Sequence, residues 1–233
     1  MSILTTTQLT GQSESHLLES NGLRLQVDAL SAFLELSRRA KLAGFDLRVA
    51  SGFRSFDRQL KIWNEKLSGQ RKVLDDLGRI VDVASLEGFD QLLAVLRFSA
   101  MPGASRHHWG TDVDVYDARA MPDSSRLQLI AAEVDAKGVF AAMHNWLDEQ
   151  IAAGDSCGFI RPYSKDLGGV AVERWHLSYA PVALQCQRQF SIEQLRRVIG
   201  SADIVGQPLI LKNLEQLYCR FVEVDESCYQ VLS

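Results

Sequence analysis

Two short segments of the chain hold residue types that together could bind a metal ion and carry out hydrolysis. The first segment, Ser105 to Asp114, contains two adjacent histidines and two aspartates, and the second, Glu173 to His176, adds a glutamate and a histidine. Catalytic zinc sites draw three ligands from His, Asp and Glu and keep a fourth position for water, whereas structural zinc sites usually complete the shell with cysteines. The two segments therefore predict a catalytic zinc centre.

The first segment ends in a predicted strand. From Thr111 to Tyr116, β-branched or aromatic residues alternate with aspartates. Successive residues of a strand point to opposite faces, so Asp112 and Asp114 should project from one face and the two valines from the other. A glycine at position 110 allows a sharp turn just before the strand. A histidine on this turn, His107 or its rival His108, can then meet Asp114 at one ion.

The geometry of the second segment is left open by the sequence. Glu173 and His176 are three residues apart, a spacing that meets on one face of a helix but falls on opposite faces of a strand. The preceding residues 168–172 look like the approach to a strand or loop. The chemistry requires that His176 bind the metal and that Glu173 stay unbound, near enough to take a proton from an activated water.

At this point the motifs resemble those of a known family. The pattern Ser-x-His-x-x-Gly-x-x-x-Asp at 105–114, followed by Glu-x-x-His at 173–176, resembles the signature of the zinc D-alanyl-D-alanine carboxypeptidases of the VanY type. Upstream, Ser-Gly-Phe-Arg-Ser at 51–55 with Gln59 is similar to the family's Ser-Gly-aromatic-Arg-Ser motif. The resemblance runs from about Leu30 to Tyr179.

The resemblance implies a role for each motif residue and a single zinc ion as cofactor. Glu173 is implied as the general base. Arg54 is implied to contact either the substrate's terminal carboxylate or the carbonyl under attack, since a guanidinium suits both. The implied zinc ligands are His107, Asp114 and His176, and the implied secondary substrate contacts are Gln59 and Ser105.

Asp112 departs from the family pattern, which usually has a small residue such as alanine at that position. This extra carboxylate could orient a metal ligand from behind, add negative charge to the site, or replace Asp114 as a ligand. Arg54 has an alternative structural role, pairing with Asp57 or capping a helix. Trp109 and Trp175 either line the pocket or pack beneath it.

Composition fits a single folded domain and argues against some partners. The chain has 233 residues, 46% hydrophobic and 23% charged, with a net charge of −4. No basic stripe supports nucleic-acid binding, and no apolar run is long enough for a membrane span. Residues 1–11 lack the features of a secretory signal, which favours a cytoplasmic location, the alternative being the periplasm or cell envelope by a route that the sequence does not show. The cysteines, none in a Cys-x-x-Cys spacing, are expected to be buried free thiols, with a Cys219–Cys228 bridge as the alternative.

The expected fold class is α+β, a single domain with a central antiparallel sheet flanked by helices. The resemblance places it with the D-Ala-D-Ala dipeptidase, lysostaphin-type and Hedgehog-like zinc fold. We expect an N-terminal extension at 1–22 and a zinc peptidase domain at 23–233, with the motifs at about 30–180 and a C-terminal helix and hairpin at about 181–233. Helices are expected at 23–42, 56–67, 89–98, 126–137, 139–153 and 194–199, a strand at 45–50, and a hairpin formed by 217–224 and 228–232.

The functional expectation is a zinc peptidase that hydrolyses a bond next to a D-amino acid in peptidoglycan-derived or other D-amino-acid-containing peptides. A D-alanyl-D-alanine carboxypeptidase fits best. The alternatives are a muropeptide endopeptidase or dipeptidase of the same fold and, in another class, a catalytically silent zinc-containing binding module.

Overall fold

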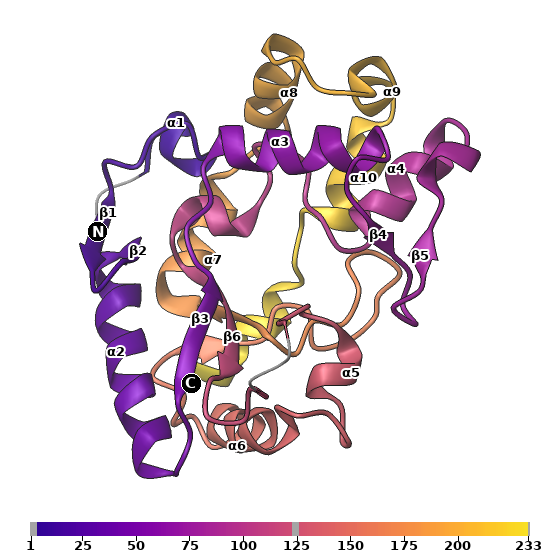
Figure 1. Cartoon of the computed structure of the whole chain (residues 1–233). Helices are drawn as coiled ribbons and strands as arrows, with labels where there is room; N and C mark the ends of the chain where they lie inside the picture. Colours follow the sequence, from indigo (N-terminus) through magenta and orange to yellow (C-terminus); the bar gives the residue numbers. More distant parts are fainter. Residues whose placement is uncertain (1–3, 123–125, 233) are drawn as a thin grey trace.

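The computed structural model describes residues 4–122 and 126–232 of the chain (Figure 1). The first elements are the short helix α1 (Thr6–Leu9) and a hairpin of β1 (Leu17–Ser20) and β2 (Leu23–Gln26). Although 1–22 is predicted as an extension, its described part packs on the rest of the domain: Leu9 is 1% exposed, and the Gly11 carbonyl accepts a hydrogen bond from the Phe56 amide.

A four-stranded antiparallel sheet forms the centre of the described structure. Its strands lie in the order β3 (Leu47–Ser51), β6 (Asp112–Asp117), β8 (His176–Tyr179) and β7 (Phe159–Ile160). The register pairs Asp114 with Ser51 on one side and with His176 on the other. Three residues from separate motifs are therefore cross-strand neighbours.

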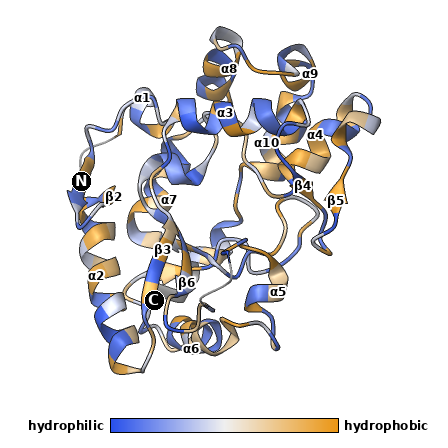
Figure 2. Ribbon diagram, in the orientation of Figure 1, coloured by the Kyte–Doolittle hydropathy of each residue, from blue (hydrophilic) through white to orange (hydrophobic). Residues whose placement is uncertain are grey.

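The two faces of this sheet differ in polarity. Val113, Val115 and Leu177 point to one face, where they pack against α2 (Val27–Leu42) and α6 (Ala141–Ala152). Figure 1 shows α2 running beside β3, and Figure 2 shows the hydrophobic and hydrophilic segments that alternate along this helix. Strand periodicity sends Asp112 and Asp114 to the opposite face, as the alternation in the sequence predicts.

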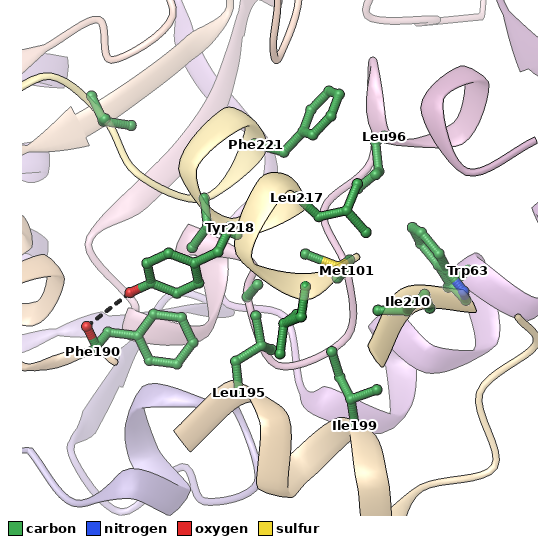
Figure 3. Packing of buried hydrophobic residues seen from close by; sticks show 14 of the residues in the cluster. Trp63, Leu96, Met101, Phe190, Leu195, Ile199, Ile210, Leu217, Tyr218 and Phe221 are labelled. Atoms are coloured by element: carbon green, nitrogen blue, oxygen red, sulfur yellow. Dashed lines mark hydrogen bonds between the residues drawn. The ribbon is translucent and has the colours of Figure 1, made fainter. Parts of the chain in front are cut away.

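A second, larger hydrophobic cluster holds most of the remaining helices together (Figure 3). Tyr218 lies within it and donates a hydrogen bond to the Phe190 carbonyl at 2.9 Å. The helices that contribute are α3 (Phe56–Leu67), α4 (Phe89–Leu96), α7 (Ala180–Gln189), α8 (Ile192–Ser201), α9 (Gln207–Lys212) and α10 (Leu214–Phe221). The remaining short elements are β4 (Val73–Leu74), β5 (Ile80–Val81), η1 (Val83–Ser85), η2 (Arg106–Trp109), α5 (Ala131–Val134) and η3 (Glu226–Leu232).

The α+β fold class is confirmed, but three expected elements are wrong in part or in whole. The helix predicted from Leu23 begins only at Val27, because 23–26 pairs with β1 and the Gln26 side chain caps the helix. The helix predicted at 126–137 is reduced to α5, because the Glu133 carboxylate accepts the amide hydrogens of Gln128 and Leu129 and holds the preceding residues in a loop.

The predicted C-terminal hairpin is a helix followed by a 3₁₀ helix. Its first half is α10, in which the buried side chains have helical spacing. They are Leu214, Leu217, Tyr218 and Phe221. All four cysteines are free, so the Cys219–Cys228 bridge is not formed. Of the four, only Cys186 is buried; Cys157 and Cys228 are partly buried, and Cys219 is exposed. No described helix is both long and apolar enough to cross a bilayer.

Candidate metal centre

His107, Asp114 and His176 meet on the polar face of the central sheet. One possible ligand atom from each of them lies within 4.8 Å of the others, and all three side chains are buried. His107 belongs to η2, Asp114 to the middle of β6, and His176 to the start of β8. Asp114 and His176 are directly paired across the two strands, so the sheet register itself brings the acid to the histidine.

A glycine at position 110 delivers His107 to this sheet. It ends η2 in the left-handed region, with φ of 69°. A Cβ atom there would lie 2.4 Å from Cδ2 of Leu17 and 3.0 Å from the backbone nitrogen of Gln26. The sharp turn predicted at this position is confirmed, and the glycine is needed both for its dihedral angle and for the close approach of β2.

Replacing Gly110 with alanine should therefore destabilise the fold by about 1–3 kcal/mol for the backbone conformation alone, and by more because of the crowded Cβ. Gly154→Ala is the matched control, since Gly154 has φ of 75° but no atom within 4 Å of the added Cβ. Urea unfolding should give a larger loss of unfolding free energy for Gly110→Ala. Equal losses in the two variants would show that the approach of β2 costs nothing.

The hydrogen-bond partners of the two histidines decide which ring nitrogen faces the centre. Nδ1 of His107 lies 3.0 Å from the Gly52 carbonyl and 3.2 Å from the Asp112 carbonyl, which leaves Nε2 at 3.4 Å from Asp114. In His176 the ring is reversed: Nε2 lies 2.9 Å from Oδ1 of Asp112, and Nδ1 lies 3.2 Å from Asp114. A ring nitrogen that donates to a carbonyl or carboxylate leaves the other one as a ligand. His107 thus offers Nε2, and His176 offers Nδ1.

The electrostatics of this cluster suit a cation. Oδ1 of Asp114 is buried and makes no hydrogen bond among the described residues, although Nδ1 of His176 lies 3.2 Å from it. Burial raises the pKa of the Asp114 carboxyl, but the two histidines outweigh burial and hold that pKa far below its usual range. Two imidazoles and one ionised carboxylate make the donor set of a catalytic zinc site, so the residues present fit this metal.

Glu173 stands beside the three candidate ligands. Its Oε2 lies 3.6 Å from Nδ1 of His176, and its side chain is 11% exposed. Glu173 and His176 lie neither on one helix nor on one strand, because a turn joins them. The His176 amide donates to the Glu173 carbonyl at 3.1 Å, and β8 starts at the histidine. Burial raises the pKa of Glu173 to about 7, a value suited to a group that takes up and returns a proton near neutral pH.

Arg54 reaches the same cluster from the loop after β3. Its Nη2 donates to the Ser51 hydroxyl at 2.8 Å and lies 3.9 Å from Asp114. Its Nη1 donates to Oε1 of Gln59 at 2.9 Å. Ser55, not Arg54, caps α3, so neither structural alternative for Arg54 is what the structure contains. Its guanidinium therefore faces the centre.

Gln59 and Ser105 are both buried near Arg54 and the candidate ligands. Gln59 is 0% exposed, and its amide nitrogen donates to the Ala100 carbonyl at 2.7 Å, so both its polar atoms are engaged within the protein. It acts here as a support for Arg54. Ser105 precedes η2, and its side chain makes no capping hydrogen bond.

His108 is directed away from the cluster. Its Nδ1 donates to the Arg54 carbonyl at 2.6 Å, and its Nε2 accepts the Gly103 amide hydrogen at 3.1 Å. Burial lowers the pKa of His108 to about 3, so the ring stays neutral and both nitrogens serve the fold. Trp109 and Trp175 are 3% and 4% exposed, and each packs into a hydrophobic cluster.

Sequence reasoning missed three residues that surround the cluster. The Tyr163 ring lies 5.1 Å from the His176 ring, and Arg106 contacts Asp112. Lys66 donates to the Ser99 hydroxyl at 2.6 Å, and burial lowers its pKa to about 8. The charge of Arg54 lowers this pKa further, and the charge of Glu173 raises it. Because Lys66 follows Gln59 by two helical turns of α3, helix periodicity could have found it.

Comparison with known proteins assigns the family. The sequence profile of VanY, described as D-alanyl-D-alanine carboxypeptidase, matches residues 22–182. An uncharacterized protein of Haemophilus influenzae is 43% identical over 103 residues, which cover 42% of this chain and 70% of that protein. A D-alanyl-D-alanine carboxypeptidase of Enterococcus faecalis is 25% identical over 172 residues, which cover 70% of this chain and 51% of that protein.

A solved structure shares the fold. VanYB in complex with D-alanine-D-alanine superposes with a TM-score of 0.50 at 22% identity, covering 77% of this chain and 86% of that chain. The fold and the site define a peptidase-like domain with a candidate metal centre. The chain belongs to the VanY family of D-alanyl-D-alanine carboxypeptidases, and the resemblance inferred from the motifs is confirmed.

Proposed function

We propose that this protein is a zinc-dependent peptidase that hydrolyses the peptide bond before a terminal D-alanine in peptidoglycan-derived peptides. The observation that carries the proposal is the buried cluster of His107, Asp114 and His176 with Glu173 beside it and free of any ion pair to Lys or Arg among the described residues. A protein that only bound zinc would need the ligands but not the neighbouring acid.

The residues divide the work of hydrolysis. Zinc held by His107, Asp114 and His176 would supply Lewis acidity, which activates water and polarises the carbonyl under attack. The Glu173 carboxylate takes the proton from the attacking water and returns it to the leaving amine, which a pKa near 7 favours. Arg54 supplies a fixed positive charge for the oxygen that becomes negative, or for the terminal carboxylate of the substrate.

A carboxypeptidase needs a positive group for the free carboxylate of its substrate. Arg54 and Lys66 both lie on the α3 side of the centre, and the charge of Arg54 contributes to the lowered pKa of Lys66. Two cations would allow one to hold the carboxylate while the other stabilises the developing negative charge. This pair supports an enzyme that removes a terminal residue.

Replacing Arg54 with lysine should lower kcat/KM by about 10²–10³-fold, the typical cost of losing one donor to a developing oxyanion. An ammonium cannot bridge Ser51 and Gln59 as the guanidinium fork does. Zinc affinity should stay unchanged, because Arg54 is not a ligand. Arg48→Lys, an exposed arginine on the preceding strand, is the control. Wild-type kcat/KM in Arg54→Lys would show that catalysis does not need the two-pronged shape of the guanidinium.

The function is tested with a muropeptide pentapeptide ending in D-Ala-D-Ala. The protein is loaded with a measured amount of zinc, and the products are identified by mass with and without chelator. Chelator-sensitive release of single D-alanine supports the proposal. An internal cut or release of a dipeptide would change the assignment to endopeptidase or dipeptidase, and absence of cleavage by the zinc-loaded protein would contradict peptidase activity on this substrate.

A further inference from the structure

The geometry points to Asp112 and Arg106 as a positioning pair that orients His176 for metal binding, an inference that rests on the proposed zinc site. Oδ1 of Asp112 lies 2.9 Å from Nε2 of His176. The other nitrogen of the same ring, Nδ1, faces Asp114 at 3.2 Å and Glu173 at 3.6 Å. By accepting the Nε2 hydrogen, the Asp112 carboxylate leaves the Nδ1 lone pair directed at the centre.

Asp112 serves the other candidate histidine ligand through its backbone. Its carbonyl oxygen lies 3.2 Å from Nδ1 of His107. Asp112 also stands opposite Ser178 in the register of β6 and β8, so its position is fixed by the central sheet. One residue therefore contacts the outer nitrogens of both histidines, from a rigid element instead of a loop.

The ion pair with Arg106 allows the Asp112 carboxylate to be buried. Asp112 is 0% exposed, and a buried charge without a partner strongly destabilises a fold. Nε of Arg106 donates to Oδ1 of Asp112 at 2.8 Å, and the Thr111 hydroxyl donates to Oδ2 at 2.5 Å. Both Asp112 oxygens are thus occupied, and neither faces the centre.

The Arg106 guanidinium is itself fixed by further hydrogen bonds and by an aromatic ring. Its Nη2 donates to the Ser178 hydroxyl at 2.7 Å, and its Nη1 donates to Oε1 of Gln187 at 3.2 Å. Its guanidinium also lies 4.8 Å from the centre of the Trp109 ring. These contacts fix the direction of the Nε–H bond, and through Asp112 they fix the plane of the His176 ring.

The arrangement selects among the three roles that the sequence left open for Asp112. The carboxylate lies behind His176 and is paired with an arginine, so it neither replaces Asp114 as a ligand nor adds unpaired negative charge to the centre. The small residue usual at this position in VanY-type enzymes could not form the contact. Arg106 and Asp112 therefore act as a unit that this chain adds to the shared motif.

The test measures zinc affinity and the state of the His176 ring rather than activity. Asp112→Ala should weaken zinc binding by about 10–100-fold, the usual cost of losing a partner of a ligating histidine. It also leaves Arg106 buried without its carboxylate partner, which destabilises the fold independently of zinc. Arg106→Met/Asp112→Ala removes both charges and should regain thermal stability while keeping the weakened affinity. Asp112→Asn keeps an acceptor at Oδ1 and should lose less affinity than Asp112→Ala.

Zinc affinity is measured by competition with a chromophoric chelator, and the Nε2 proton of His176 is followed by NMR in the zinc-loaded protein. In the wild type this proton should exchange slowly, and in the double variant it should exchange fast. Asp166→Ala, which removes a carboxylate from the exposed pair with Arg97, is the control and should change neither reading. Wild-type affinity with a slowly exchanging proton in the double variant would overturn the inference. Failure of the wild type to bind zinc would instead overturn the proposed function.

Discussion

Replacing Glu173 with glutamine should lower kcat by about 10²–10⁴-fold, the usual contribution of a general base, and leave zinc bound. Glutamine has the same shape as glutamate but cannot accept the proton of the attacking water. The backbone at this position is held by the Glu173 amide, which donates to the Tyr163 carbonyl at 3.1 Å, so the turn should survive the change. The measurement is single-turnover cleavage of the pentapeptide by protein of known zinc content.

Glu149→Gln is the matched control, since Glu149 is exposed on α6. It should retain wild-type turnover and wild-type zinc content. Full hydrolytic activity in Glu173→Gln would show that the base is another group. Loss of zinc in that variant would make Glu173 a ligand and would leave the water without the base proposed for it.

The parts of the site that lie on regular elements could be predicted from the sequence. The alternation from Thr111 to Tyr116 gave the strand and the common face of Asp112 and Asp114, and both are found in β6. The boundaries predicted for the helix after Arg54 agree with α3, Phe56–Leu67. Local periodicity is sufficient to predict an element where its two faces differ in polarity.

The parts that depend on contacts between distant segments could not be predicted. No spacing rule connects Gln59 with Ala100, or Arg106 with Ser178, and these pairs decide what each side chain does. The Glu173–His176 geometry depends on a turn that neither helical nor strand periodicity describes. The prediction of a C-terminal hairpin was wrong because the segment assigned to its first strand began at Leu217. That segment leaves out Leu214, which lies on the same buried face of α10.

The adjacent histidines His107 and His108 should respond differently to replacement by alanine. Both were candidate ligands in the sequence, but only His107 faces the centre in the structure. His107→Ala should weaken zinc binding by more than the roughly 100-fold that the loss of an outer partner costs, since Nε2 of His107 faces Asp114 directly. Turnover should fall with it. The zinc-free protein should also lose some thermal stability, because the buried His107 ring contacts two carbonyls through Nδ1 and faces the Asp114 carboxylate through Nε2.

His108→Ala should have the opposite pattern. The His108 ring joins the Arg54 carbonyl to the Gly103 amide, and it fills the space beside Gly11, where an added Cβ would lie 2.3 Å from its Nδ1. Its removal should lower the free energy of unfolding by about 2–5 kcal/mol, as for other large-to-small core changes, with zinc affinity nearly unchanged. Chelator competition and thermal unfolding on both variants give the four readings. Loss of zinc in His108→Ala with retention in His107→Ala would reverse the ligand assignment, because these neighbours project from η2 toward different parts of the fold.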